Sequence, residues 1–371
     1  MSAGDGAERG ELRQVVREFL SERSPSQEVR RLMAAGESRD DQVWSLLAEQ
    51  LGLTGIAVPE RYGGAGYGPV ELGIVLEEMG GALLVAPYFA TVALAGQTLA
   101  ASGDEVAMAC WLPRIADGSL TATLAVAEDS GSWDLAEVAA TAQPAGGGWV
   151  VTGSKLFVID GDTADLLLVA AHAPDGPGVF AVDRGAAGVE STRLDTLDLT
   201  RALASVALHG APAVRVGAGR DTVAWLSEVR DLALAALAAE QLGGAARCLD
   251  TAVGYAKVRE QFGRPIGSFQ AIKHKCANLL VEVESGRSAV YHASEALAGK
   301  EKDAPLAAVL AYAYCSQAFT RAAKECIQIH GGIGYTWEHD AHLYLRRASR
   351  TAAPTTSPAR QRTRLAELAG I

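Results

Sequence analysis

The sequence predicts an α+β fold that is mostly helical, with helical regions at both ends and a small β-domain between them. Two observations predict this class. Apolar residues recur at helical spacing before about residue 118 and again after about residue 215, whereas short β-rich segments bounded by turn residues fill the middle. We therefore expect an N-terminal helical domain over 1–118, a middle β-domain over 119–215 and a C-terminal helical bundle over 216–371.

The N-terminal region carries a helical pattern interrupted by a loop. Leu72, Val75, Leu76 and Met79 share one helical face, because residues three and four positions apart lie together on a helix surface. The segment Val58–Gly66 is rich in glycine and includes a proline, so it is predicted as a loop.

The middle region reads as short strands. The segment Trp149–Ile159 is predicted as a hairpin that turns at Gly153 and Ser154. Further strands are expected over Leu166–Ala170, Val179–Val182 and Leu203–Leu208, each bounded by Gly, Pro or Asp. Closely spaced short strands with turn signals indicate a compact barrel or sandwich.

The C-terminal region predicts three long helices over about 223–259, 269–297 and 305–330. Long apolar-striped helices joined by short loops are typical of an antiparallel bundle. In the tail, 349–364, Pro354 and Pro358 are expected to break any helix, because proline lacks the backbone donor that a helix needs.

Composition limits the possible functions. The 371 residues carry a net charge of −11, which gives a nucleic-acid role no electrostatic support. The five cysteines form no CxxC motif, so we expect reduced thiols and a cytosolic protein. The polar first ten residues do not resemble a signal peptide, and no apolar run approaches the roughly 20 residues that span a bilayer. We therefore expect a cytoplasmic protein that does not enter a membrane.

Two segments have the chemistry of a ligand site. In Arg259–Gln270, Arg259 offers a permanently charged fork suited to a pyrophosphate, Phe262 an aromatic surface, and Gln270 a hydrogen-bonding amide at a helix start. In Gln328–Trp337, glycines that follow a helix let a ligand approach bare backbone N–H groups. Either segment alone is also common as a purely structural connection between helices.

Together, these segments resemble the acyl-CoA dehydrogenase family in order and spacing. The resemblance also covers Gly55–Gly66, Trp149–Lys155 and Trp337–Arg346. It implies a β-barrel-like middle domain, a C-terminal four-helix bundle, and FAD at a subunit interface, with one chain holding the flavin half and its neighbour the adenine half. It also implies oxidation of an acyl-CoA, with electrons passed to an acceptor flavoprotein. The adenine-side positions that match the family pattern are Arg259, Phe262, Ile266, Gln270, Gln328, Gly331 and Gly332.

The flavin-facing positions depart from the family pattern. Ala127 stands where a flavin-contacting hydroxyl is usual, and Trp133 replaces a small serine. In the next motif, Phe157 could still stack on the flavin, but Ile159 lacks the hydroxyl expected near flavin N5.

The catalytic carboxylate is also missing from its usual places. Its tail position is occupied here by Thr355, and its alternative position on the first bundle helix by Ala233, followed by Leu234 instead of arginine. Asp231 and Glu240 are the nearby acids. Asp231 points about 200° away from Ala233 around the helix, whereas Glu240 shares its face about 10 Å along the axis. Each is a weak candidate base, with a salt-bridged or bundle carboxylate as the alternative.

Two histidine features have structural alternatives. His339 and His342 have HxxH spacing, but no third ligand is evident, so no metal site is expected. His330 is interpreted as a packing or hydrogen-bonding residue beside the glycine turn.

This uneven pattern suggests a specific role. We expect the non-catalytic partner of an α2β2 acyl-CoA dehydrogenase, which supplies adenine-side contacts to FAD held by a homologous, Glu-bearing subunit. The resemblance to such subunits implies steroid side-chain or similarly bulky acyl-CoA substrates. The alternatives are a homo-oligomeric dehydrogenase with a displaced base, or another use of the fold, such as a monooxygenase-like activity or a scaffold.

Overall fold

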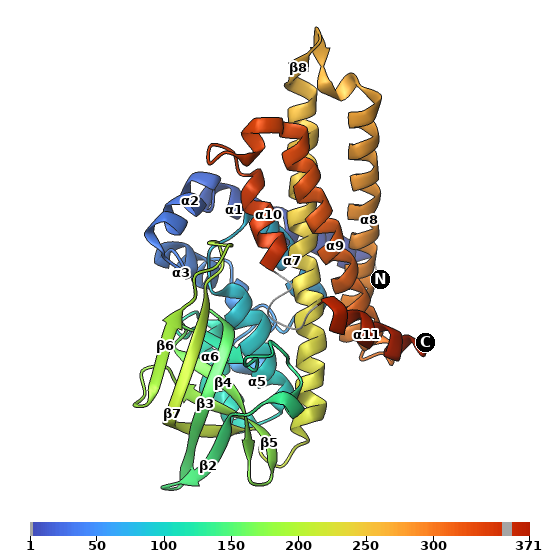
Figure 1. The fold of residues 1–371 in the computed structure, drawn as a ribbon. Coiled ribbons are helices and arrows are strands. Elements are labelled where there is room, and N and C mark those ends of the chain that lie inside the picture. Colours follow the sequence, from blue (N-terminus) through green and yellow to red (C-terminus); the bar gives the residue numbers. More distant parts are fainter. Residues whose placement is uncertain (1–2, 351–357) are drawn as a thin grey trace.

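The N-terminal region of the protein is a group of helices packed beside the β-domain (Figure 1). The structure is a computed structural model that describes residues 3–350 and 358–371. The helical elements of this region are α1 (Ala3–Arg23), α2 (Ser26–Ala35), α3 (Asp41–Glu49), α4 (Pro69–Ala82), the π-helical η3 (Phe89–Gly96), α5 (Gln97–Ser102) and α6 (Glu105–Ala116), with short 3-10 turns at Leu53–Gly55 and Glu60–Tyr62.

Side-chain caps set where several helices begin. The Asp40 carboxylate accepts the backbone N–H of Val43 at 3.0 Å at the start of α3, and Asp104 caps α6 in the same way. Such a cap satisfies a donor that would otherwise lack a partner, which contributes about 1 kcal/mol. The boundaries therefore follow from aspartates in the sequence.

The middle region forms a closed β-barrel with two flanking strands. Its elements are β1 (Ala122–Ala125), β2 (Thr141–Ala145), β3 (Gly148–Ile159), β4 (Leu166–Ala173), β5 (Gly176–Asp183), β6 (Val189–Arg193) and β7 (Leu203–Val216). The strands pair in the order β4–β2–β3–β7–β5, and β5 pairs back with β4 to close the ring. β1 lies beside β4, and β6 lies beside β7. The predicted barrel-like domain is thus confirmed.

The hairpin predicted at Gly153 and Ser154 is wrong. β3 runs unbroken from Gly148 to Ile159, and the turn lies earlier, at Gly146 and Gly147 between β2 and β3. Gly153 instead follows a β-bulge in the pairing with β7, and its φ of 149° suits glycine. A Cβ atom at this position would lie 2.6 Å from the Cβ of Ala140, so close backbone approach also requires glycine.

The C-terminal region is a bundle of long helices: α7 (Thr222–Val258), α8 (Gln270–Ala298), α9 (Ala304–His330) and α10 (Ala341–Arg350), followed by α11 (Pro358–Ala369). A small hairpin, β8 (Glu260–Gln261) and β9 (Arg264–Pro265), and the 3-10 turn Ile266–Ser268 join α7 to α8 at the tip of the bundle (Figure 1). The turn η6 (Gly331–Tyr335) follows α9. The three predicted bundle helices are confirmed, each end lying within one residue of its expected position.

Two details of this region qualify the sequence-based expectations. By length and composition α7 could cross a membrane, but 83% of its most apolar window is buried inside the fold, as in the core helix of a bundle. No helix passes through Pro358, because α11 begins at that proline, and Pro354 lies outside the described residues. Proline is favoured in a first helical turn, where its missing N–H would have no partner anyway.

Candidate functional site

The adenine-side residues gather at one end of the bundle. Arg259 follows the last turn of α7, and its backbone N–H donates to the Tyr255 carbonyl at 2.9 Å. The Arg259 carbonyl accepts the N–H of Ile266 at 2.8 Å, which fixes the base of the β8–β9 hairpin. α9 runs antiparallel to α8, so Gln328, Gly331 and η6 lie at the same end as this hairpin (Figure 1).

Most of these side chains face outward. Phe262, at the tip of the hairpin, is 92% exposed and has a positive φ of 54°. Arg259, Gln270 and Gln328 are also exposed, and Ile266 is half-buried. A large aromatic side chain so far from the core gains little from burial within its own chain. The tip therefore presents an aromatic ring, a guanidinium and two amides to another molecule.

The two glycines at the end of α9, Gly331 and Gly332, are there for different structural reasons. Gly331 has a φ of 65°, which the turn itself demands, whereas a Cβ at Gly332 would meet no atom within 4 Å. Packing within this chain therefore does not require glycine at position 332. Close approach of a ligand to the backbone N–H of this residue would require it. With Arg259 at the same tip, this donor set fits the pyrophosphate and adenosine of FAD.

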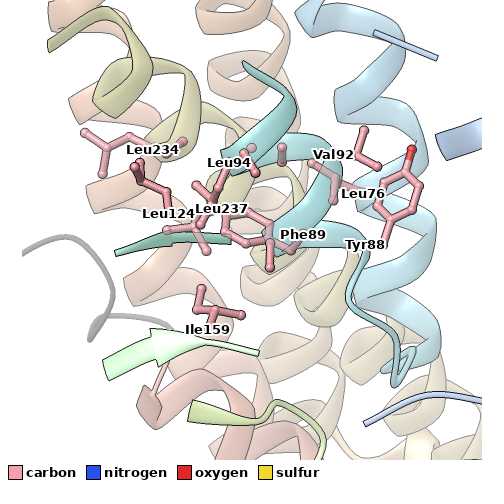
Figure 2. Packing of buried hydrophobic residues seen from close by; sticks show 14 of the residues in the cluster. Leu76, Tyr88, Phe89, Val92, Leu94, Leu124, Ile159, Leu234 and Leu237 are labelled. Atoms are coloured by element: carbon pink, nitrogen blue, oxygen red, sulfur yellow. The ribbon is translucent and has the colours of Figure 1, made fainter. Parts of the chain in front are cut away.

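The positions matched to flavin contacts form an apolar, buried wall. Ala127, Ile159, Ala233 and Leu234 are each at most 3% exposed. In Figure 2, Ile159 on β3 and Leu124 on β1 lie with Leu234 and Leu237 of α7 and with Phe89 and Leu94 of η3, all belonging to one cluster of buried residues. Trp133 is also buried, at 7% exposure, and Phe157 is half-buried with a φ of 57°. The wall at these positions is therefore made mainly of apolar side chains.

A buried ion pair supports this part of the β-domain. Lys155 is fully buried, and its Nζ donates to Glu128 at 2.7 Å and to the Val126 carbonyl at 3.1 Å. Glu128 also accepts backbone N–H groups from Ala139 and Ala140. Burial opposes ionisation of Glu128, but Lys155 and these donors outweigh it and lower its pKa. Both residues thus organise the loop and strand beside the wall.

Glu240 lies in a buried ionic cluster. Its carboxylate accepts hydrogen bonds from Arg201 and from Arg347 of α10, and Arg347 also pairs with Asp198 at 2.8 Å. Burial would raise the pKa of Glu240, but the two guanidiniums outweigh it and lower the pKa. A carboxylate held ionised by two arginines is a weak proton acceptor, because both positive charges favour its deprotonated form.

Asp231 is held by the C-terminal helix. Its Oδ1 accepts from Arg364 of α11 at 2.5 Å, and Arg230 lies 4.0 Å away. Burial raises the Asp231 pKa, against the opposing effect of Arg364. Both Asp231 and Glu240 are therefore engaged by arginines, and Thr355 lies outside the described residues.

Asp160, next to Ile159, is a titratable group that sequence reasoning passed over. It is buried, with a positive φ of 53°, and burial raises its pKa to about 7. The neighbouring Arg201 only partly offsets the burial. The place of Asp160 next to Ile159, at the end of a segment compared with the family pattern, is the signal that could have found it.

The histidines near the tip take part in ring contacts. His342 packs edge-on against Trp337 at 4.7 Å between ring centroids, and the His339 ring contacts the His330 ring at 4.2 Å in a tilted arrangement. Among residues 3–350 and 358–371, no group of three or more His, Cys, Asp or Glu side chains is arranged to hold a metal ion.

Comparison with known proteins identifies the family. Models of the acyl-CoA dehydrogenase N-terminal, middle and C-terminal domains match residues 6–119, 123–209 and 232–367. The chain belongs to the acyl-CoA dehydrogenase family. It is 37% identical to the acyl-CoA dehydrogenase IpdE2 of Mycolicibacterium smegmatis over 358 residues, which cover 96% of this chain and 97% of that protein. It is 34% identical to IpdE2 of Mycobacterium tuberculosis, over 95% of this chain and 94% of that protein.

Solved structures of family members agree with the fold. The Tcur3481-Tcur3483 steroid acyl-CoA dehydrogenase has a chain that is 33% identical, with a TM-score of 0.89 and 98% of each chain covered. The ChsE4-ChsE5 complex of Mycobacterium tuberculosis has a chain that is 29% identical, with a TM-score of 0.88 over 98% of this chain and 97% of that one. Family membership supports an oxidoreductase that acts on CH–CH donors, in a family whose members bind FAD.

Sequence reasoning also missed Arg201, Arg347 and Tyr255 as site-supporting residues. Tyr255 lies one helical turn before Arg259, so its spacing could have placed it beneath the adenine-side loop. Arg201 and Arg347 offered no comparable signal, because their common partner Glu240 is distant from both in the sequence.

Proposed function

We propose that this chain is the supporting subunit of a heteromeric acyl-CoA dehydrogenase that introduces an α,β double bond into an acyl-CoA thioester. It supplies the adenine-side contacts to FAD whose flavin half is held by a homologous, catalytic partner subunit. The observation that carries the proposal is the contrast between the two halves of the site. The exposed tip retains the ligand-binding residues, whereas hydrocarbon lines its own flavin-facing wall.

Each tip residue has a role that its chemistry supports. Arg259 would pair with the FAD pyrophosphate through two parallel N–H donors, and the N–H groups of Gly331 and Gly332 would reach its oxygens. The exposed ring of Phe262 would cover the adenine face. Gln270, Gln328 and the half-buried Ile266 complete the set, with amides for polar edges and one apolar contact. When bound, FAD supplies the hydride acceptor, and the partner supplies the base.

The names of two relatives support a heteromeric assembly and a steroid substrate, and we propose an α2β2 arrangement for this chain. One matching structure is of a complex of two named chains, and another is of a steroid acyl-CoA dehydrogenase that also carries two names. We extend both features to this chain: a homologous partner, and steroid side-chain or similarly bulky acyl-CoA substrates. We further propose a cytoplasmic location, electron transfer to an acceptor flavoprotein, and domain boundaries at 118/119 and 215/216.

A homo-oligomeric dehydrogenase with a displaced base is the second candidate. Glu240 and Asp231 would be its bases, but Glu240 is engaged by Arg201 and Arg347, and Asp231 by Arg364. A scaffold that binds no flavin is the third candidate function. It does not explain why the ligand-binding residue types are exposed at the tip. These observations favour the supporting subunit over both.

Arg259→Ala in the co-expressed complex tests the proposal. We expect the FAD dissociation constant to rise at least tenfold, about 1.4 kcal/mol, because a charged pair to the pyrophosphate is lost. Lys257→Ala removes an exposed positive charge two residues earlier on the same helix and controls for general electrostatics. Equal FAD affinity in the Arg259→Ala and wild-type complexes would contradict the proposed role.

A further inference from the structure

His330 lies at the junction of the two adenine-side segments. It is the last residue of α9, is 5% exposed, and its ring lies between two others. The Tyr255 ring of α7 stacks on it at 4.3 Å with an interplanar angle of 29°, and the His339 ring contacts it at 4.2 Å. Three elements therefore meet at this one imidazole.

These ring contacts link both halves of the tip. The Tyr255 carbonyl accepts the N–H of Arg259, while His330 directly precedes Gly331 and Gly332. A shift of His330 relative to Tyr255 would change the distance between the guanidinium and the glycine N–H groups. His330 is thus placed to set the relative position of these two FAD-binding segments.

The hydrogen bonds of His330 and His339 define where a proton can add. The His330 Nδ1 lies 2.7 Å from the Cys326 carbonyl but 3.7 Å from the Cys326 sulfur, so this N–H donates to the carbonyl. Its Nε2 is then the atom that gains or loses a proton. The Nδ1 of His339 accepts the N–H of Ala341 at 3.1 Å, which its neutral form can do.

The groups around His330 come from three elements. Tyr255 lies on α7, Cys326 lies on α9 beside Cys248 of α7, and His339 and Asp340 precede α10. Asp340 is paired with Arg30 of α2 at 2.6 Å, so its charge is compensated.

Protonation favours one of the two histidines in contact. Burial lowers the pKa of His330, but hydrogen bonding to Cys326 outweighs it and raises the pKa overall. Burial and the neighbouring His330 lower the pKa of His339. On acidification the proton therefore goes to His330, at the C-terminal end of α9, where the helix dipole favours a cation.

We propose that His330 is a positioning residue whose protonation places a positive charge behind the FAD-binding turn, so that the complex holds FAD more tightly as the pH falls. The proposal rests on the function proposed above. The two phosphate charges of FAD and the imidazolium stabilise each other, so bound FAD and the bound proton increase each other's affinity equally. For a charge partly screened by salt, the expected effect is roughly threefold to tenfold in the FAD dissociation constant.

Titration of the FAD-depleted complex with FAD from pH 8.5 to pH 6.0 tests the proposal, with flavin fluorescence as the readout. The wild-type dissociation constant should fall by roughly threefold to tenfold on acidification. His330→Phe keeps a stacking ring but cannot be protonated, and should give a flat profile. His330→Gln, also neutral, provides the same comparison if the phenylalanine variant does not fold.

One control isolates the imidazole. His292→Phe removes a mostly exposed histidine on α8 and should keep the wild-type pH dependence. A wild-type profile without pH dependence would overturn the proposal, as would pH dependence that persists in both His330 variants. If the wild-type complex bound no FAD at any pH, the proposed function would fail along with this inference. Persistent dependence in the variants would overturn this inference alone.

Discussion

Replacement of Gly332 separates a ligand-binding role of the glycine turn from a folding role. A Cβ at Gly332 meets no protein atom within 4 Å, and the backbone there is outside the left-handed region. Gly332→Ala should therefore leave the unfolding free energy of the chain unchanged or raise it by up to about 1 kcal/mol, because alanine restricts the unfolded chain. In the complex, the new methyl group would occupy the space through which phosphate oxygens approach the N–H groups.

We expect this methyl group to weaken FAD binding at least tenfold, or about 1.4 kcal/mol. Gly334→Ala is the matched control, because its Cβ would lie 2.9 Å from the Ile327 carbonyl oxygen and 3.1 Å from the Ile327 Cα. It should lower the unfolding free energy by about 1–3 kcal/mol. Thermal denaturation measures the change in unfolding free energy, and FAD titration measures the dissociation constant. A Gly332→Ala complex with wild-type FAD affinity would refute the assignment of this glycine to the ligand.

Two further predictions concern buried charges. Asp160 has a folded-state pKa of about 7, above its ordinary value of 3.8, so its contribution to stability falls as the pH rises from 4 to 7. Asp160→Asn should therefore raise the unfolding free energy of the chain at pH 8 by up to about 4 kcal/mol. Urea denaturation should show this gain vanish near pH 4. An equal gain at both pH values would exclude titration of Asp160 as its cause. Glu240→Gln should cost about 3 kcal/mol, because the buried Arg347 and the half-buried Arg201 lose their common partner. The same change at Glu282, paired with the exposed Arg321, should cost under about 1 kcal/mol, and similar losses for both would count against a special buried cluster.

The helical bundle could be predicted from the sequence because its signal repeats. Apolar positions recur over many turns of α7, α8 and α9, so one misleading residue does not shift a boundary. The β-domain gave a weaker signal. Glycine is common both in turns and beside β-bulges. Only the pairing of β3 with β7 shows that Gly153 lies beside a bulge.

The part of the candidate site that lies in short, continuous segments could be predicted from the sequence. The adenine-side positions lie in two short segments, and their exposure at the tip follows from the helix ends that carry them. The environment of Glu240 depends instead on Arg201 and Arg347, which only the packed fold brings together. Pro358 shows the same limit, because one residue type suits both a helix break and a first helical turn.

FAD stoichiometry measures the division of labour between the subunits most directly. The chain should be purified alone and with its co-expressed homologous partner, and the flavin absorbance of each preparation compared with its protein concentration. A supporting subunit predicts about one FAD per two chains in the complex and colourless protein when this chain is made alone. One FAD per chain in the isolated protein would contradict the proposed division, and Glu240 and Asp231 would then be the residues to replace.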